Sequence, residues 1–332
     1  MTSDTTFKVP SLASGGLMLS YRCTNACRHC MYRCGPTRSD QWLSPQLAGR
    51  IFEALAAEAH FSDIHLAGGE AMLRPELLAE IIRLAVARGV AISYLETNVA
   101  WCVDERRSRE GFARLRDAGL RGVLISASPF HNEFIPFGKT KMGIAAAREV
   151  FGRGGVLVWT QAMYDALSRL DEDRTHTVEE FIAACGLDGM KALRGLYPMT
   201  PHGRVVEALR ECFDRRPAES FRDECCGREL ASTGHFHIDP QGRLFTGHCP
   251  GIIMGEAGDY HPAIAAGERP VAHTLWSAGP YALMQRAIEH AGYRPRADGY
   301  VSKCDLCLHV RGALRTAGGY AEVGPADFYA AD

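Results

Sequence analysis

The sequence lacks the features that would place it in a membrane or outside the cell. It has no run of eighteen apolar residues, so no transmembrane helix is predicted. Its first residues, MTSDTTFKVPSLASGG, contain no basic segment followed by an apolar one, so we expect no signal peptide. An excess of charge is also lacking, since 37 basic residues face 39 acidic ones. This balance argues against wholesale binding of nucleic acid or membrane surfaces. We therefore expect a cytoplasmic protein with neither kind of partner.

What the sequence does contain is cysteine, with twelve residues in a chain of 332. Thiols in a reducing compartment do not persist as disulfides, so metal or redox chemistry is the better interpretation. Apolar residues make up 46% of the chain and charged residues 23%, which is enough for a full core and excludes global disorder.

Short apolar runs alternate with helical patterns over the first two hundred residues. Strands are predicted over residues 16–21, 64–67, 90–97, 123–127 and 156–161, with a weaker sixth at 192–196. Helices are predicted over residues 45–59, 75–88, 106–118, 140–151 and 178–184, and Ser44 and Thr177 are N-cap candidates. Such alternation predicts a parallel α/β sheet, either doubly wound or a partial barrel.

The pattern becomes irregular after about residue 205, and we place a boundary at 205–215. Residues 236–246 predict a β-hairpin, because Pro240 and Gly242 interrupt two apolar runs at turn positions. Five of the twelve cysteines follow residue 220. This cysteine-rich part therefore has a character of its own.

Three cysteines, Cys23, Cys27 and Cys30, fall within eight residues directly after the first predicted strand. Closely spaced thiolates on one loop suit a soft metal centre such as an iron–sulfur cluster, and three ligands leave one iron open. Two alternatives remain. Together with Cys34, these residues have the spacing of one helix face, which a buried apolar stripe would also give. The same four thiols also match a structural zinc site in number.

The CX3CX2C spacing resembles the signature of radical S-adenosylmethionine (radical SAM) enzymes. The resemblance implies a partial (β/α)6 barrel of the TIM type over about residues 16–205, preceded by a polar leader at 1–15. It also implies that Cys23, Cys27 and Cys30 hold a [4Fe–4S] cluster with SAM on the open iron. Electron transfer from the cluster then cleaves SAM to a 5′-deoxyadenosyl radical, which abstracts a substrate hydrogen.

Further segments at the predicted strand ends resemble motifs of the same family. The segment Gly68-Gly69-Glu70 resembles its GGE motif, Thr97-Asn98 its TNG motif with Val99 in place of glycine, and residues 201–204 its PxGR segment. The two glycines also allow close backbone approach to a ligand. The cofactor-binding residues implied in this way are Gly68, Gly69, Glu70, Asn98, Ser126, Ser128 and Gln161.

The C-terminal cysteines resemble the auxiliary-cluster domains of SPASM and Twitch type, so residues 206–332 are predicted to form such a domain. The resemblance implies a second [4Fe–4S] cluster held by four cysteines: Cys226 (or its neighbour Cys225), Cys249, Cys304 and Cys307. A zinc ribbon made of the same four residues is the alternative. His235 and His237 share one strand face, which we interpret as ordinary polar strand positions.

The loop after the fourth predicted strand offers His131 and Glu133 as catalytic candidates, because a barrel has its active site at the carboxyl ends of its strands. The overall hypothesis is a radical SAM enzyme that oxidises or rearranges a small biosynthetic intermediate, reduced by a partner such as flavodoxin or ferredoxin. One alternative is a maturase that crosslinks or epimerises a ribosomally made peptide. It is less favoured because no leader-recognition domain is expected before the first strand. The second alternative is a non-catalytic, zinc-stabilised binding protein.

Overall fold

A single open sheet of eight strands crosses the whole molecule in the computed structural model, which describes residues 6–330. The strand order is β6-β5-β4-β3-β2-β7-β8-β9. The first five of these, β6 to β2, are parallel neighbours from the N-terminal half. Their bounds are β2 (Ser14–Met18), β3 (Asp63–Ala67), β4 (Ile92–Thr97), β5 (Val123–Ser126) and β6 (Val156–Trp159). The predicted mixed α/β fold with a partial, unclosed barrel is confirmed.

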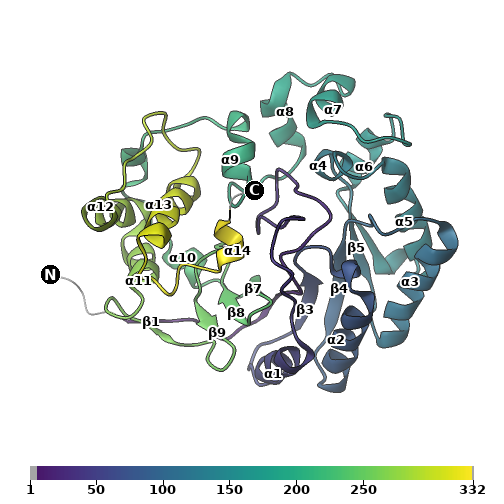
Figure 1. Ribbon diagram of the computed structural model, residues 1–332, viewed down its shortest axis with the longest axis horizontal. Helices are drawn as coiled ribbons and strands as arrows, with labels where there is room; N and C mark the ends of the chain where they lie inside the picture. The colour runs from purple at the N-terminus through teal and green to yellow at the C-terminus, as the bar shows by residue number, and fades with distance from the viewer. Residues whose placement is uncertain (1–5, 331–332) are drawn as a thin grey trace.

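Four long helices cover the outer side of these parallel strands (Figure 1). They are α1 (Pro45–Ala56), α2 (Pro75–Ala87), α3 (Glu105–Ala118) and α5 (Phe137–Phe151). The predicted cap at Ser44 is confirmed, since its side chain accepts a hydrogen bond from the Leu47 amide. Thr177 likewise caps α7 (Val178–Ala184) and forms a capping box with Glu180.

The predicted sixth strand is wrong, because residues 192–196 lie in helix α8 (Gly189–Leu196). Leu193 and Tyr197 are buried four residues apart, which is the spacing of a helix face. The sixth parallel strand is instead β7 (Phe236–Ile238), which pairs with β2 at the opposite edge of the barrel.

The predicted hairpin is confirmed as β7 and β8 (Arg243–Phe245), which pair antiparallel, and β9 (Gly255–Glu256) extends it. The Asp239 carboxylate closes the turn by accepting from the amides of Gln241 and Arg243. The sheet therefore continues without interruption across the predicted boundary at 205–215, which itself stays a prediction.

Part of the predicted polar leader is a strand. β1 (Phe7–Lys8) pairs with β10 (Ala263–Ile264), whereas residues 1–5 lie outside the described part of the chain. The C-terminal half packs three long helices beside the sheet (Figure 1): α11 (Pro270–Ser277), α12 (Gly279–Ala291) and α13 (Lys303–Ala317). The shorter helices are α4 (Pro129–Asn132), α6 (Gln161–Leu167), α9 (Val205–Ala208), α10 (Gly227–Leu230) and α14 (Ala326–Tyr329).

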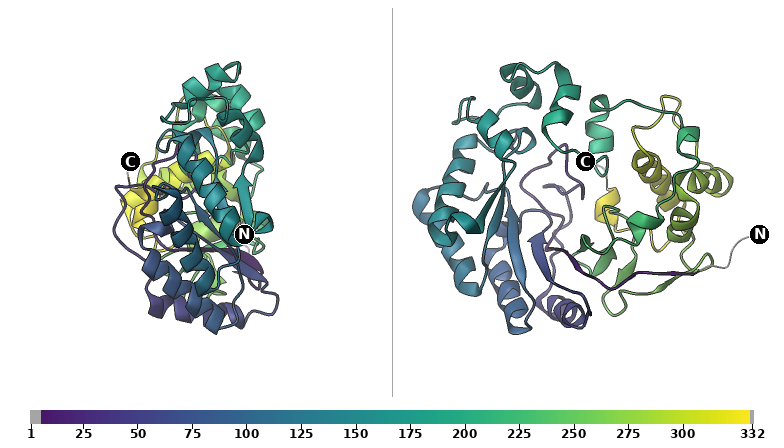
Figure 2. Two further views of the ribbon diagram at one scale, coloured as in Figure 1. Left: turned by 90° about the vertical axis from the view of Figure 1, so that its right-hand side faces the viewer. Right: turned by 180° about the vertical axis from the view of Figure 1, so that it is seen from behind.

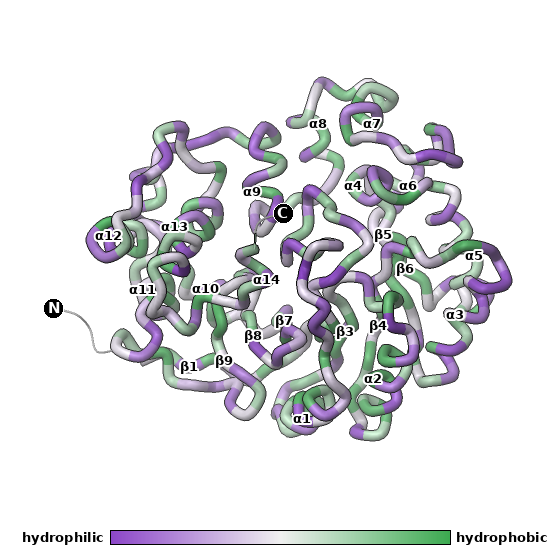
Figure 3. Tube along the Cα trace, in the orientation of Figure 1, coloured by the Kyte–Doolittle hydropathy of each residue, from purple (hydrophilic) through white to green (hydrophobic). Residues whose placement is uncertain are grey.

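Two buried apolar clusters hold this arrangement together. The larger lies between the strands and the covering helices and continues under α11, α12 and α13. The smaller surrounds the long segment between β2 and α1, which lies between the two halves (Figure 2). Hydrophobic residues follow the strands, while hydrophilic ones recur on the outer turns of α3 and α5 (Figure 3). No helix within residues 6–330 is long and apolar enough to cross a membrane.

Candidate active site

A cavity of about 500 Å³ lies where the parallel strands end and the cysteine-rich loop begins. Strand β2 ends at Met18, so the loop with the three cysteines starts at the same sheet edge as the ends of β3, β4 and β5. The cavity brings together most of the predicted site residues. Those that line it are Cys23, Cys27, Cys30, Gly68, Gly69, Glu70, Asn98, Ser126 and His131.

The cysteine loop is closed by its own backbone and is not a helix. Its two ends are joined by bonds from the Cys23 amide to the Gly35 carbonyl (3.1 Å) and from the Gly35 amide to the Tyr21 carbonyl (3.1 Å). No helix lies between Met18 and Pro45, all of which belong to the described chain. The alternative of a buried helical cysteine stripe is therefore wrong.

The segment that resembles PxGR fastens this loop from outside. The Arg204 guanidinium donates to the carbonyls of Cys27 (2.8 Å) and Cys34 (3.1 Å), and its amide donates to the Cys30 carbonyl (3.0 Å). Gly203 has φ +54°, and a Cβ there would lie 2.1 Å from the Met31 carbonyl oxygen. Glycine and arginine are thus both required for the same close contact.

The thiols of the loop sit in an environment suited to a cluster. Burial is the main cause that raises the pKa of Cys23, to about 12, and of Cys27, whereas a hydrogen bond from the Cys34 thiol lowers the pKa of Cys30. Burying such thiolates requires a compensating positive partner. The donor set fits the predicted iron–sulfur cluster.

The spacing of the thiols separates a cluster from zinc. A tetrahedral zinc ion with bonds of about 2.3 Å would bring its sulfur ligands within about 3.8 Å of one another. Among residues 6–330, no three cysteines have their Sγ atoms within 4.8 Å of each other. Thiolates on different irons of a cube lie farther apart, so the spacing is compatible with a cluster.

The glycines that resemble the GGE motif serve the cysteine loop. A Cβ at Gly69 would lie 1.7 Å from the Arg22 carbonyl oxygen, and one at Gly68, where φ is +110°, 2.7 Å from that of Ser20. The close approach that we expected toward a ligand is therefore made to the protein's own backbone. Both residues also line the cavity.

Glu70 and Asn98 connect the ends of β3 and β4 to this loop. The buried Glu70 carboxylate accepts from Thr97 Oγ1 (2.9 Å) and from the amides of Asn98 (2.8 Å) and Met72 (3.1 Å). Burial raises the pKa of Glu70 to about 7. The Asn98 side chain donates to Thr24 Oγ1 (2.9 Å) and approaches Cys23 Sγ at 3.6 Å. A change at either position would disturb the first cluster ligand.

Val99, which replaces the glycine of the resembling TNG motif, adopts φ +55°. This left-handed conformation is unfavourable for a β-branched residue. The Val99 side chain is fully buried against Gly143. A Cβ at Gly143 would lie only 2.8 Å from Cγ1 of Val99. Gly143 on α5 thus makes room for the valine that this chain has instead of glycine.

The predicted serine pair separates at the end of β5. Leu124 and Ser126 are two residues apart on β5, so they share one strand face, and both line the cavity. Ser128 lies beyond the strand as the N-cap residue of α4, and its Oγ is 2.7 Å from Nδ1 of His131. Burial lowers the pKa of His131 to about 4, so this ring is a neutral hydrogen-bonding group in the cavity wall.

Gln161 and Glu133 lie outside the cavity lining. Strand β6 ends at Trp159, two residues earlier than predicted, because Thr160 caps α6 and Gln161 becomes its first residue. Gln161 then binds Asp165 at 2.8 Å. The Glu133 carboxylate pairs with Arg28 of the cysteine loop (2.7 Å), which gives it a role in holding that loop.

The four predicted C-terminal ligands come together from three segments of the chain. Burial first, and then the nearby thiols of Cys307, Cys249 and Cys304, raise the pKa of Cys226. Cys225 is exposed, and its carbonyl accepts a hydrogen bond from Lys303. The sequence did not decide between Cys225 and Cys226. The geometry favours Cys226 as the member of this second cysteine site.

A buried arginine accompanies the second cysteine site. Arg311 is 5% exposed, hydrogen-bonds Cys307 and donates to the Pro250 carbonyl, but its Nε has no hydrogen-bond partner. Burying a cation is costly without an anion beside it. Four thiolates around an iron–sulfur cluster carry net negative charge, so the surroundings fit that group.

Sequence reasoning missed several residues of the cavity wall. His65, on β3, is packed against His235 and His237, which we interpreted as ordinary polar strand positions and which are in fact inside. Tyr32 and Tyr197 are buried there as well. Alternation along β3 could have indicated that His65 faces inward. Its proximity to the histidines of β7 depends on the strand order, which the sequence does not reveal.

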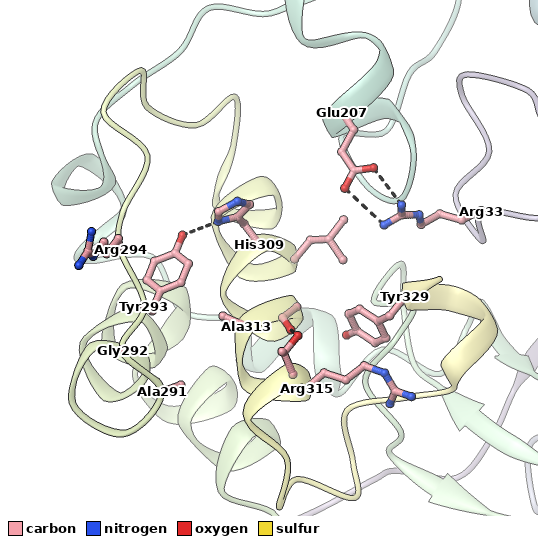
Figure 4. Close-up of a pocket in the computed structure, with 13 residues that line it drawn as sticks. Arg33, Glu207, Ala291, Gly292, Tyr293, Arg294, His309, Ala313, Arg315 and Tyr329 are labelled. Atoms are coloured by element: carbon pink, nitrogen blue, oxygen red, sulfur yellow. Dashed lines mark hydrogen bonds and ion pairs between the residues drawn. The ribbon is translucent and has the colours of Figure 1, made fainter. Parts of the chain in front are cut away.

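A larger cavity of about 810 Å³ lies beside α13 and contains none of the predicted site residues (Figure 4). Several of its polar groups are paired with one another. Arg33 pairs with Glu207 at 3.0 Å, and the Tyr293 hydroxyl is 2.7 Å from Nδ1 of His309. The smaller cavity at the cysteine loop holds most of the predicted site residues and is therefore the candidate active site.

Comparison with known proteins gives a family match. The family described as the radical SAM superfamily matches residues 17–186, just over half of the chain. The curated proteins contain no match.

Three solved structures illustrate the similarity. The crystal structure of BtrN in complex with AdoMet and 2-DOIA is 14% identical over 90% of this chain and 92% of that one, with a TM-score of 0.43. A histidine-tagged form of anSMEcpe with bound AdoMet is 12% identical over 92% and 97%, with a TM-score of 0.45. Methylornithine synthase (PylB) is 16% identical over 45% and 44%, with a TM-score of 0.34.

Proposed function

The chain belongs to the radical SAM superfamily, and from this premise we propose that it oxidises or rearranges a small-molecule intermediate by abstracting a hydrogen atom from it. Family membership implies a [4Fe–4S] cluster and SAM. When bound, these two groups supply a 5′-deoxyadenosyl radical through reductive cleavage of SAM. We favour this proposal over the zinc-stabilised, non-catalytic alternative, because no three cysteines of residues 6–330 have the close spacing of zinc ligands.

The observation that carries the proposal is one cavity shared by the cysteine loop, the ends of the strands and the inner side of the sheet. Cys23, Cys27 and Cys30 would hold the cluster, since Arg204 already fixes their loop. Glu70, Asn98 and Ser126 face the same space and would contact SAM. A substrate beyond SAM would meet His131, which is neutral and bound to Ser128.

The size of the cavity supports a small substrate. About 500 Å³ lies within the range of small-molecule sites. The inner wall offers Tyr94, Glu96 and Trp159, which are suited to a polar molecule with hydroxyl or carbonyl groups. A ribosomally made peptide would need a longer groove, so we favour the small molecule over the peptide.

We further propose that the second cysteine site holds another [4Fe–4S] cluster and accepts the second electron of a net oxidation. Cys226, Cys249, Cys304 and Cys307 would give every iron a protein ligand and leave none open to substrate. The buried Arg311 supports an anionic group there. Electrons for SAM cleavage would come from a reduced flavodoxin or ferredoxin.

The first test measures 5′-deoxyadenosine and methionine after anaerobic reconstitution with iron and sulfide, in the presence of dithionite and SAM. We expect wild-type protein to form both and Cys30→Ala to form neither. Cys185→Ala is the matched control, because this thiol lies in neither cysteine site. Equal product from wild type and Cys30→Ala would refute the proposed cleavage.

The second test counts metals in a variant with Cys23, Cys27 and Cys30 all changed to alanine. About four residual iron atoms per chain would support a second cluster and the net oxidation. Zinc without iron would make the C-terminal cysteines a structural ribbon. The electron-accepting role would then be lost, and a redox-neutral rearrangement would replace it.

A further inference from the structure

Three histidines meet inside the candidate active site, away from the cysteines. His65 lies on β3, while His235 and His237 belong to the β7 segment. One ring nitrogen from each lies within 4.8 Å of the other two. Throughout residues 6–330, no other three histidine, cysteine or acidic side chains meet this criterion.

The strand between them is shaped to let them meet. Gly16 of β2 pairs with His65 on one side and with His237 on the other. A Cβ at Gly16 would lie 2.6 Å from Nε2 of both rings. Any other residue at this position would therefore fill the space into which the two imidazoles converge.

The ring nitrogens are buried and only partly satisfied. His65 and His237 are each 4% exposed, and neither Nε2 of His65 nor Nδ1 of His237 has a hydrogen-bond partner. Buried polar atoms are rarely left in this state.

An acidic side chain completes the surroundings. Glu96 on β4 has its Oε1 3.7 Å from Nε2 of His65 and remains 41% exposed toward the cavity. The three rings pack against one another, with centroids 4.9–5.4 Å apart, and none donates a hydrogen bond to another. Ring packing alone leaves the free nitrogens unexplained, whereas a shared cation would satisfy them.

We propose that His65, His235 and His237 bind a divalent transition-metal ion as its three protein ligands, with the Glu96 carboxylate nearby to balance its positive charge. Imidazole nitrogen suits zinc and the neighbouring first-row metals. Three protein nitrogens leave a coordination position open to the cavity. That position would bind a substrate hydroxyl, carbonyl or carboxylate oxygen and hold the molecule in the cavity. This site goes beyond the proposed function, because metal binding here requires neither SAM nor electron transfer.

The test uses Zn²⁺ as the probe on the full-length protein with its clusters reconstituted. Equilibrium dialysis against buffered zinc, with metals counted by mass spectrometry, gives the affinity and stoichiometry. We expect one zinc per chain in addition to the cluster iron. Loss of one ligand, as in His237→Gln, should weaken binding by about 100-fold or more, since even indirect partners of metal ligands contribute 10–100-fold.

Two controls keep the result interpretable. His309→Gln removes a histidine of α13 that lies outside this cavity, and it should leave zinc affinity unchanged. His235→Gln changes the half-buried member of the triad, so it provides a variant whose fold is least disturbed if His237→Gln unfolds. Far-ultraviolet circular dichroism and iron content verify the fold of each.

X-ray absorption at the zinc edge then identifies the ligands. Nitrogen and oxygen neighbours at about 2.0–2.1 Å are expected, whereas cysteine ligands would give sulfur at about 2.3 Å. The proposal is overturned if no zinc binds, if sulfur surrounds it, or if His235→Gln and His237→Gln bind zinc as tightly as the wild type. None of these outcomes bears on whether SAM is cleaved.

Discussion

The two cysteine sites are built in opposite ways. The first takes three thiols from eight consecutive residues, on a loop whose ends are joined by backbone hydrogen bonds. The second takes four thiols from three segments, at Cys226, Cys249 and the start of α13. The first site is therefore organised by local chain, and the second by the folding of the whole C-terminal half.

A buried arginine serves each site differently. Arg204 donates to carbonyl oxygens of the loop and so fixes its shape. Arg311 lies against Cys307 itself and keeps an unpartnered Nε. Protein hydrogen bonds thus hold the first loop, whereas the second site has a buried cation whose charge balance depends on what the thiols bind.

The largest effect on Tm is expected when the cysteines of each site are replaced in turn. Changing Cys304 and Cys307 to serine should lower Tm by about 10 °C, because three distant segments lose their common centre. The matched variant, with Cys27 and Cys30 changed to serine, should lose SAM cleavage and lower Tm by only about 2–3 °C. Differential scanning calorimetry of both reconstituted variants measures the difference. Equal decreases would show that the two sites support the fold alike.

Replacement of each buried arginine by methionine is expected to have the next largest effect. Arg204→Met removes two charge-assisted hydrogen bonds and should cost about 3–5 kcal/mol of loop stability, so the first cluster is lost to a chelator many times faster. Iron release followed by absorbance measures this. Release at the wild-type rate would show that the loop keeps its shape without the guanidinium.

Arg311→Met should act on the other site. Without the cation, the reduced and more negative form of the proposed second cluster is less stable, so its reduction potential should fall while SAM cleavage persists. Redox titration followed by electron paramagnetic resonance measures the potential. Loss of SAM cleavage in this variant would instead show that Arg311 acts on the first cysteine site.

Cys34 provides a smaller test within the first site. Its amide donates to Cys30 Sγ at 3.3 Å and its thiol forms a second hydrogen bond to the same sulfur. Cys34→Ala keeps the amide but loses the thiol, worth about 1 kcal/mol, so the rate of SAM cleavage should change by less than about tenfold. Cys34→Ser retains a donor and should lie closer to wild type. Loss of the cluster in Cys34→Ala would make Cys34 a ligand.

The smallest effect is expected at Val99. Replacement by glycine relieves a left-handed conformation that costs about 1–2 kcal/mol, but it removes a buried side chain that contributes about 1.5–3 kcal/mol. The free energy of unfolding of Val99→Gly in urea should therefore fall by only about 1 kcal/mol. A loss above about 4 kcal/mol would show that the contact with Gly143 dominates.

The sequence predicts what depends on neighbouring residues. The strands from β2 to β6 and their covering helices are visible because each has a strong local pattern, and the cysteine spacing locates the first site. Short apolar segments are ambiguous, and α8 shows this, since its few apolar positions also suit a strand.

Features that depend on distant pairing are not visible in the sequence. Strand β7 joins β2 rather than following β6, and only this arrangement brings His237 to His65 across Gly16. The boundary error at Gln161 has a local cause, because Thr160 begins a helix where the apolar run predicted more strand. Chemistry within one loop is thus predictable, and chemistry between strands requires the register.

The pairing of β7 with β2 also determines when the sheet can be completed during synthesis. Gly15 pairs with Phe236, more than two hundred residues later. At about 5–20 residues per second, the ribosome delivers that partner roughly 10 to 45 s after β2 has been made. During this interval one edge of the first barrel strand lacks its partner, and an unpaired strand edge can pair with other chains.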